Sequence, residues 1–99
     1  MNHQSLVHEA FAMKYIKPGL YKHFKGNNYL IISIVVHSEN EAPLVLYTAE
    51  SNKENKLWTR PLELFFSEIE TSDGLKTRFS FLRNLNENEK RLVKRRLFT

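Results

Sequence analysis

The chain has 99 residues, of which 41% are hydrophobic and 26% charged, and its net charge is +4. This composition indicates one compact domain and excludes general disorder. The longest apolar run, Leu30 to Val36 interrupted by Ser33, is too short to span a bilayer. The absence of cysteine excludes disulfides, thiolate catalysis and cysteine-ligated zinc. We expect a cytoplasmic protein with no membrane partner, because the N-terminus lacks the pattern of a signal peptide.

The first segment has the pattern of a helix. Ser5 to Ile16 places apolar side chains on one side at helical spacing, and Pro18-Gly19 then ends the pattern. The sequence therefore predicts a short amphipathic helix in an N-terminal extension over residues 1–18.

Five segments after this extension have the composition of strands, with β-branched and aromatic residues between polar or glycine-containing turns. The predicted strands are Leu20–Lys25, Tyr29–His37, Leu44–Glu50, Leu57–Arg60 and Lys76–Phe81. Between the last two, Pro61 is suited to open a helical turn, and a helical spacing of apolar residues continues as far as Ile69.

A basic helix is predicted at the C-terminus. Asn86 has the position of an N-cap and Glu89 that of its capping-box partner, and the helix is expected to run to about Leu97. Leu92 and Val93 belong to its apolar stripe, and charged residues lie at the edges of that stripe.

Short strands, tight turns and flanking helices favour a mostly-β fold, and we expect a small, strongly bent antiparallel barrel of SH3-like type. The barrel is expected over residues 19–82. The basic helix, residues 83–99, is expected to pack on the same single domain.

Several blocks of the sequence resemble one bacterial family, the domain of unknown function DUF1653, between Gly19 and about Phe81. The blocks are Gly19-Leu20-Tyr21-Lys22-His23-Phe24-Lys25-Gly26, His37-Ser38-Glu39, Val45-Leu46-Tyr47, Leu57-Trp58-Thr59-Arg60-Pro61-Leu62-Glu63-Leu64-Phe65 and Arg78-Phe79. The resemblance implies a small mostly-β domain. It implies no activity, cofactor or catalytic residue.

Trp58 and Arg60 are the main candidates for ligand binding, with Tyr47, Tyr21 and His23 as neighbours from other strands. Aromatic rings stack on bases, rings or cations, and an arginine holds a carboxylate or phosphate through parallel hydrogen bonds. The alternative is structural: a core tryptophan, with an arginine that stacks over it and pairs with a nearby glutamate.

His37 and Glu39, with Glu41 close by, are weaker candidates for proton transfer or metal binding, because imidazole and carboxylate serve both purposes. The alternative is a polar loop whose side chains pair locally. We expect no metal and no cofactor.

A second candidate surface is the basic helix, where Lys90, Arg91, Lys94 and Arg95 form a broad face that would neutralise nucleic-acid phosphates or an acidic protein. The alternative is a solvated face, since basic residues at a helix C-terminus also suit the helix dipole.

These patterns favour a non-enzymatic binding module that recognises a peptide, a nucleotide or a nucleic-acid segment through Trp58 and Arg60. One alternative is a small enzyme or accessory domain acting on a nucleotide-like anionic substrate, with His37 and Glu39 transferring protons and Arg60 holding the anion. Another is a homo-oligomer joined by its terminal helices.

Overall fold

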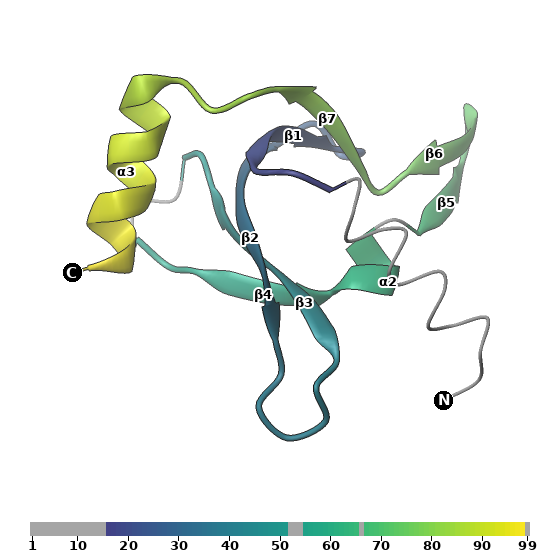
Figure 1. Ribbon diagram of the computed structural model, residues 1–99. Coiled ribbons are helices and arrows are strands. Elements are labelled where there is room, and N and C mark those ends of the chain that lie inside the picture. Colours follow the sequence, from purple (N-terminus) through teal and green to yellow (C-terminus); the bar gives the residue numbers. More distant parts are fainter. Residues whose placement is uncertain (1–15, 52–54, 66, 99) are drawn as a thin grey trace.

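The computed structural model describes residues 16–51, 55–65 and 67–98. Its larger sheet is antiparallel, with the strand order β4-β3-β2-β1-β7 (Figure 1). These strands are β1 (Gly19–His23), β2 (Asn28–Val36), β3 (Pro43–Ala49), β4 (Trp58–Pro61) and β7 (Phe79–Arg83). A smaller antiparallel sheet pairs β5 (Glu68–Thr71) with β6 (Gly74–Thr77), and the helices are α2 (Leu62–Phe65) and α3 (Glu87–Leu97). The mostly-β prediction is confirmed, whereas the predicted N-terminal helix lies almost wholly outside the described residues.

The larger sheet is strongly bent but open. Register shifts interrupt its ladders between Leu20 and Tyr21 and between Ile31 and Ser33, and such irregularities bend a strand and increase its twist. As a result Arg60, on edge strand β4, lies over the ring of Phe79, on the opposite edge strand β7, at 5.6 Å. No closed barrel is found in the described part of the chain, so the SH3-like barrel is not confirmed.

The two faces of this sheet carry separate cores, because neighbouring residues of a strand point to opposite sides. The inner face, where the sheet curls around α2, buries Tyr21, Ile31, Val45, Tyr47 and Phe79 with Leu62 and Phe65 of that helix. The opposite face, here called the helix face, buries Leu20 and Leu30 against Val93 of α3.

The helical pattern predicted to reach Ile69 stops at Phe65, and this part of the prediction is wrong. Ser67 follows the helix and donates to the carbonyl of Leu64 from its hydroxyl, at 2.7 Å, and from its backbone N–H, at 3.2 Å. Ile69 then pairs with Lys76 in the β5–β6 hairpin. A β-branched residue suits a strand, so apolar spacing alone did not separate the two possibilities.

The strand predicted over Lys76–Phe81 is divided at Arg78 into β6 and β7. The backbone N–H of Arg78 donates to the carbonyl of Ser67, and its carbonyl accepts from Phe24, both at 2.9 Å. The backbone of Arg78 therefore links the residue before β5 to the residue after β1, and β6 and β7 do not form one continuous strand.

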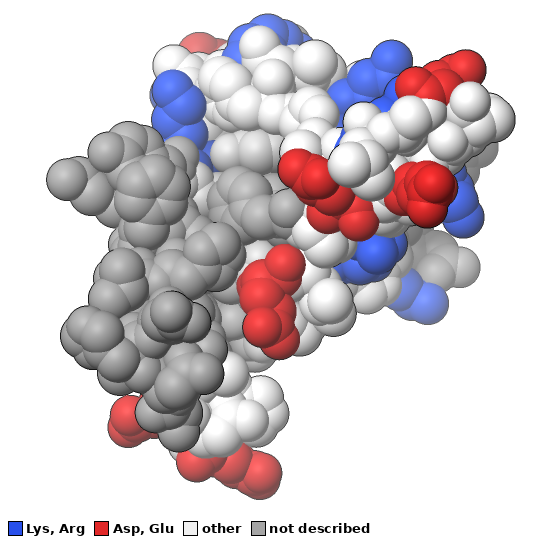
Figure 2. Space-filling model, turned by 90° about the vertical axis from the view of Figure 1, so that its right-hand side faces the viewer, with Lys and Arg blue, Asp and Glu red and all other residues white. Residues whose placement is uncertain are grey.

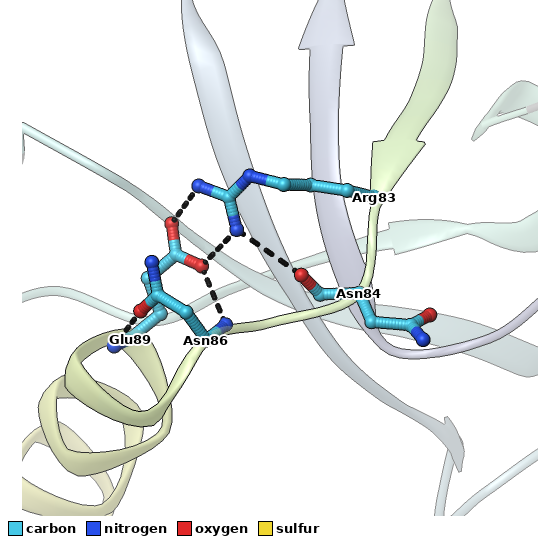
Figure 3. Close-up of polar contacts among 4 residues, drawn as sticks. All are labelled: Arg83, Asn84, Asn86 and Glu89. Atoms are coloured by element: carbon cyan, nitrogen blue, oxygen red, sulfur yellow. Dashed lines mark hydrogen bonds and ion pairs between the residues drawn. The ribbon is translucent and has the colours of Figure 1, made fainter.

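The start of α3 matches the prediction in detail. The Asn86 side chain accepts from the backbone N–H of Glu89 at 2.8 Å, and the Glu89 carboxylate accepts from that of Asn86 at 2.9 Å. Figure 3 shows that the same carboxylate also accepts hydrogen bonds from both terminal nitrogens of Arg83, at 2.7 and 3.0 Å. These hydrogen bonds lower the pKa of Glu89.

Two charged residues expected at the edges of the α3 stripe are buried instead: Glu89 is 9% exposed and Arg96 is 7% exposed. Arg96 donates to the hydroxyl of Thr48 and to the carbonyl of Ala49, each at 2.7 Å. The hydroxyl of Thr48, itself fully buried, donates to the carbonyl of Lys56 at 2.7 Å. Polar contacts therefore tie the end of α3 to β3 and to the segment that leads into β4.

None of the described helices is long and apolar enough to cross a membrane.

Candidate functional site

A cluster of aromatic rings lies on the inner face of the sheet, around Phe79. Its ring stacks on Phe65 at 4.3 Å between centroids and meets the edges of His23, Tyr29 and Tyr47 at 4.9, 5.5 and 5.9 Å. We call these five residues the ring cluster. Edge-to-face and stacked contacts of this kind hold the rings in fixed orientations.

Trp58 extends the ring cluster to the sheet edge. It pairs with Tyr47 across β3 and β4, and the two rings lie 6.0 Å apart at 43°. Trp58 is 37% exposed, so one part of the indole packs on the cluster and another part is open to solvent.

Arg60 follows two residues later on β4, and residues at this spacing point to the same side of a strand. Its guanidinium lies over the Phe79 ring, and its Nε is buried without a hydrogen-bond partner. None of the ion pairs found in residues 16–51, 55–65 and 67–98 involves Arg60. The structural alternative, a pairing with a local glutamate, finds no support among these residues. We refer to Trp58 and Arg60 as the Trp58/Arg60 corner.

His23 links the ring cluster to a group of cations. Its Nδ1 accepts from the backbone N–H of Lys25 at 3.2 Å, so in the neutral ring the proton is on Nε2. Burial lowers the pKa of His23, and the charges of Arg60, Arg78 and Lys25 lower it further. The imidazole is therefore neutral near pH 7, in surroundings that favour an anion.

Tyr21, also predicted to bind ligand, lies in the core. It is 5% exposed, its hydroxyl donates to the carbonyl of Lys17 at 2.9 Å, and its ring meets Phe65 and Phe81 edge-on at 5.6 and 5.3 Å. Burial raises the pKa of this phenol. In this position Tyr21 supports the ring cluster and offers no free polar group.

Three members of the site were missed by sequence reasoning. Tyr29, Phe65 and Phe79 contribute rings to the cluster, and the ring of Phe79 also lies beneath the guanidinium of Arg60. The sequence signal was that Tyr29 and Phe79 occupy strand positions whose alternation fits an inward direction, and that Phe65 belongs to an apolar helical spacing. Their meeting depends on the bend of the sheet.

His37 and Glu39 lie in the turn between β2 and β3, a hairpin that projects away from the rest of the sheet (Figure 1). Nδ1 of His37 accepts from the backbone N–H of Glu39 at 3.1 Å, and the His37 carbonyl accepts from Glu41 at 2.9 Å. No hydrogen bond or ion pair found among the described residues joins this turn to Arg60, and no group of three His, Asp or Glu there could hold a metal ion. The contacts within this turn are those of a polar loop.

The basic face of α3 is exposed as predicted: Lys90, Arg91, Lys94 and Arg95 all lie on the surface. Lys90 pairs with Glu87 at 3.4 Å, and Arg91 donates to the side chain of Asn88 at 2.8 Å. The C-terminal end of this helix is tied to β3 and to the segment that leads into β4, because Arg96 donates to Thr48 and Ala49 and Thr48 donates to Lys56 (Figure 1). α3 packs on the helix face of the sheet, whereas the Trp58/Arg60 corner lies on the inner face.

Comparison with known proteins gives a family but no activity. Residues 19–81 match the model of DUF1653, described as a protein of unknown function. The fold is similar to that of a crystal structure of a DUF1653 protein from Bordetella bronchiseptica, with a TM-score of 0.68 and 27% sequence identity, over 75% of this chain and 96% of that one. No curated protein matches the sequence. The match spans β1 to the middle of β7, and it includes Trp58, Arg60 and the whole ring cluster.

Proposed function

Because the chain belongs to the DUF1653 family, whose description assigns no activity, we propose a function from the site alone: the protein is a binding module for a single-stranded nucleic-acid segment or its nucleotide. In this proposal the exposed part of Trp58 stacks on a base, and Arg60 binds a phosphate next to that base. Base stacking on an aromatic side chain tolerates any sequence, and it combines naturally with a cation that follows the backbone.

The observation that carries the proposal is the state of Arg60. Its guanidinium lies over an aromatic ring, with Nε buried and without a hydrogen-bond partner, and it is in no ion pair found among the described residues. A buried polar atom left without a hydrogen bond costs about 1–3 kcal/mol. The terminal nitrogens of Arg60 are not among the buried atoms and donate in none of the hydrogen bonds found among the described residues, so a phosphate oxygen at the corner would accept from them.

The basic face of α3 adds long-range attraction. Lys94 and Arg95 lie on the surface near the end of the helix that Arg96 ties to β3, and none of the ion pairs among the described residues includes them. Each phosphate neutralised by such a residue releases counterions, so affinity falls as salt rises. In this proposal the basic face of α3 raises the affinity for nucleic acid, and the Trp58/Arg60 corner positions one base and its phosphate.

Trp58 is the only tryptophan, so its fluorescence reports directly on the corner. A mixed-sequence single-stranded oligonucleotide of about 12 nucleotides should quench it at low ionic strength, since stacking changes the surroundings of the indole. In Arg60→Gln the affinity should fall at least about tenfold, equivalent to about 1.4 kcal/mol. Duplex DNA and an oligo-glutamate peptide serve as competing probes for non-specific and acidic-partner binding.

The matched control is Arg95→Gln, which removes one positive charge from α3 without touching the corner. It should weaken binding less than about threefold and should mainly reduce the salt dependence. Equal losses in the two variants would mean that only net charge matters, and absence of quenching in the unaltered protein would exclude the corner as a nucleic-acid site. Stronger quenching by oligo-glutamate would assign the corner to an acidic peptide instead.

A further inference from the structure

His23 also borders a cavity whose lining residues include neither Trp58 nor Arg60. It is an open cleft of about 440 Å³ between the end of β1, the β5–β6 hairpin and the start of β7. Its lining residues are Lys22, His23, Phe24, Leu75, Lys76, Thr77 and Ser80. We call it the hairpin cleft. Its volume is within the range of about 300–1,000 Å³ that small-molecule sites occupy.

The charge of the hairpin cleft has one sign. Lys22 and Lys76 contribute ammonium groups, and no carboxylate is among the lining residues. Lys76 pairs with Asp73 at 3.7 Å, but both side chains are largely exposed, so the pair is weak and easily exchanged for a ligand. By contrast, Figure 2 shows several acidic side chains on the surface that carries α2 and the hairpin, where Glu63, Glu68 and Glu70 are exposed. Glu68 and Glu70 stand opposite Thr77 and Leu75 in the hairpin, so these carboxylates border the cleft, and the positive charge offered to an anion comes from Lys22 and Lys76.

The cleft is lined by both hydroxyl groups and apolar side chains. The hydroxyls of Thr77 and Ser80 lie 2.9 Å apart and share one hydrogen bond, which leaves one hydroxyl proton available to a further acceptor. Phe24 lies against His23 with ring centroids 4.5 Å apart, and Leu75 is 68% exposed. Phosphate oxygens suit the lysines and the hydroxyl, while a flat ring suits Phe24 and Leu75.

We propose that the hairpin cleft binds a phosphomonoester on a ligand of the size of a nucleoside monophosphate. Lys22 and Lys76 neutralise the phosphate, the hydroxyl pair of Thr77 and Ser80 donates to it, and the ring of the ligand packs on Phe24 and Leu75. This site does not depend on the function proposed for the Trp58/Arg60 corner, because only His23 borders both.

The test is a calorimetric and NMR titration of the full chain with adenosine monophosphate, inorganic phosphate and adenosine. Adenosine monophosphate should bind at least about fivefold more tightly than inorganic phosphate or adenosine. It alone has both a phosphate for the lysines and hydroxyls and a ring for Phe24 and Leu75. Lys22→Gln and Lys76→Gln should each weaken it at least about threefold, and the double variant should weaken it more. The matched control is Lys90→Gln, since Lys90 is also an exposed lysine paired with an acidic residue three positions earlier.

The imidazole of His23 gives a second readout. It lies among Arg60, Arg78 and Lys25, whose charges lower its pKa, and it borders Lys22 and Lys76 in the cleft. A bound phosphate should raise the pKa of His23, because a nearby anion favours the protonated ring. The His23 signals should then titrate at a higher pH with adenosine monophosphate than without it.

Equal affinity for inorganic phosphate and adenosine monophosphate would overturn the proposed ligand class. Equal weakening by Lys90→Gln, or an unchanged His23 titration at saturation, would overturn the location. The lysine variants keep exposed positions, so their NMR spectra should remain those of the folded protein. Arg60→Gln should weaken binding of adenosine monophosphate less than Lys22→Gln or Lys76→Gln does, and a larger loss in Arg60→Gln would place the nucleotide at the Trp58/Arg60 corner and overturn the location proposed here.

Discussion

The two faces of the larger sheet use charged residues in opposite ways. On the helix face, Glu89 accepts from Arg83 and Asn86, and Arg96 donates to Thr48 and Ala49. On the inner face, the guanidinium of Arg60 lies over the ring of Phe79, and none of the ion pairs found among the described residues involves it.

The two faces show that a charged side chain in a small domain can serve either the stability of the fold or the binding of a ligand. Charges on the helix face close hydrogen-bond networks and hold α3 in place, so their removal should act on stability. Arg60 closes no such network among the described residues, so its removal should act on binding. The ring cluster beneath it supplies the stability of the inner face.

The largest effect is expected where the ring cluster is broken. Phe65→Ala removes a fully buried ring that stacks on Phe79, and it should lower the free energy of unfolding by about 3–5 kcal/mol. Leu64→Ala, at an exposed position of the same helix, should change it by less than about 0.5 kcal/mol. Urea unfolding followed by circular dichroism measures both. Similar losses in the two variants would mean that the inner face is not held by its rings.

A smaller loss in the free energy of unfolding is expected when hydrogen bonds on the helix face are removed. Thr48→Val keeps the shape of the side chain but removes the hydroxyl that joins Arg96 to the carbonyl of Lys56. Loss of the two hydrogen bonds made by this buried hydroxyl should cost about 1–3 kcal/mol. Thr59→Val, at an exposed position of β4, is the control and should be nearly neutral. A neutral Thr48→Val would show that α3 is held by its apolar contacts alone.

Features set by neighbouring residues could be predicted from the sequence. The capping box of α3 depends on residues three positions apart, and Trp58 and Arg60 share a side because strand side chains alternate. The turn after β1 was predicted from Gly26, which has a positive φ of 108°.

Features that require distant segments to meet could not be predicted. The burial of Arg96 depends on Thr48 and Ala49, nearly fifty positions away, and a charged residue at the edge of a stripe gave no sign of it. The hairpin cleft was missed because the segment around Ile69 was assigned to a helix, which left no β5–β6 hairpin to form its wall. The position of Phe79 under Arg60 depends on the bend of the whole sheet.

The most direct test of the account is the free energy of unfolding of Arg60→Gln, measured beside its affinity for the single-stranded oligonucleotide. Loss of the contact with Phe79 should cost no more than about 1 kcal/mol, and removal of the unbonded Nε should offset part of that cost. We therefore predict stability within about 1 kcal/mol of the unaltered protein together with a clear loss of affinity. A loss of stability above about 2 kcal/mol with affinity retained would contradict the account, since Arg60 would then serve the fold and not a ligand.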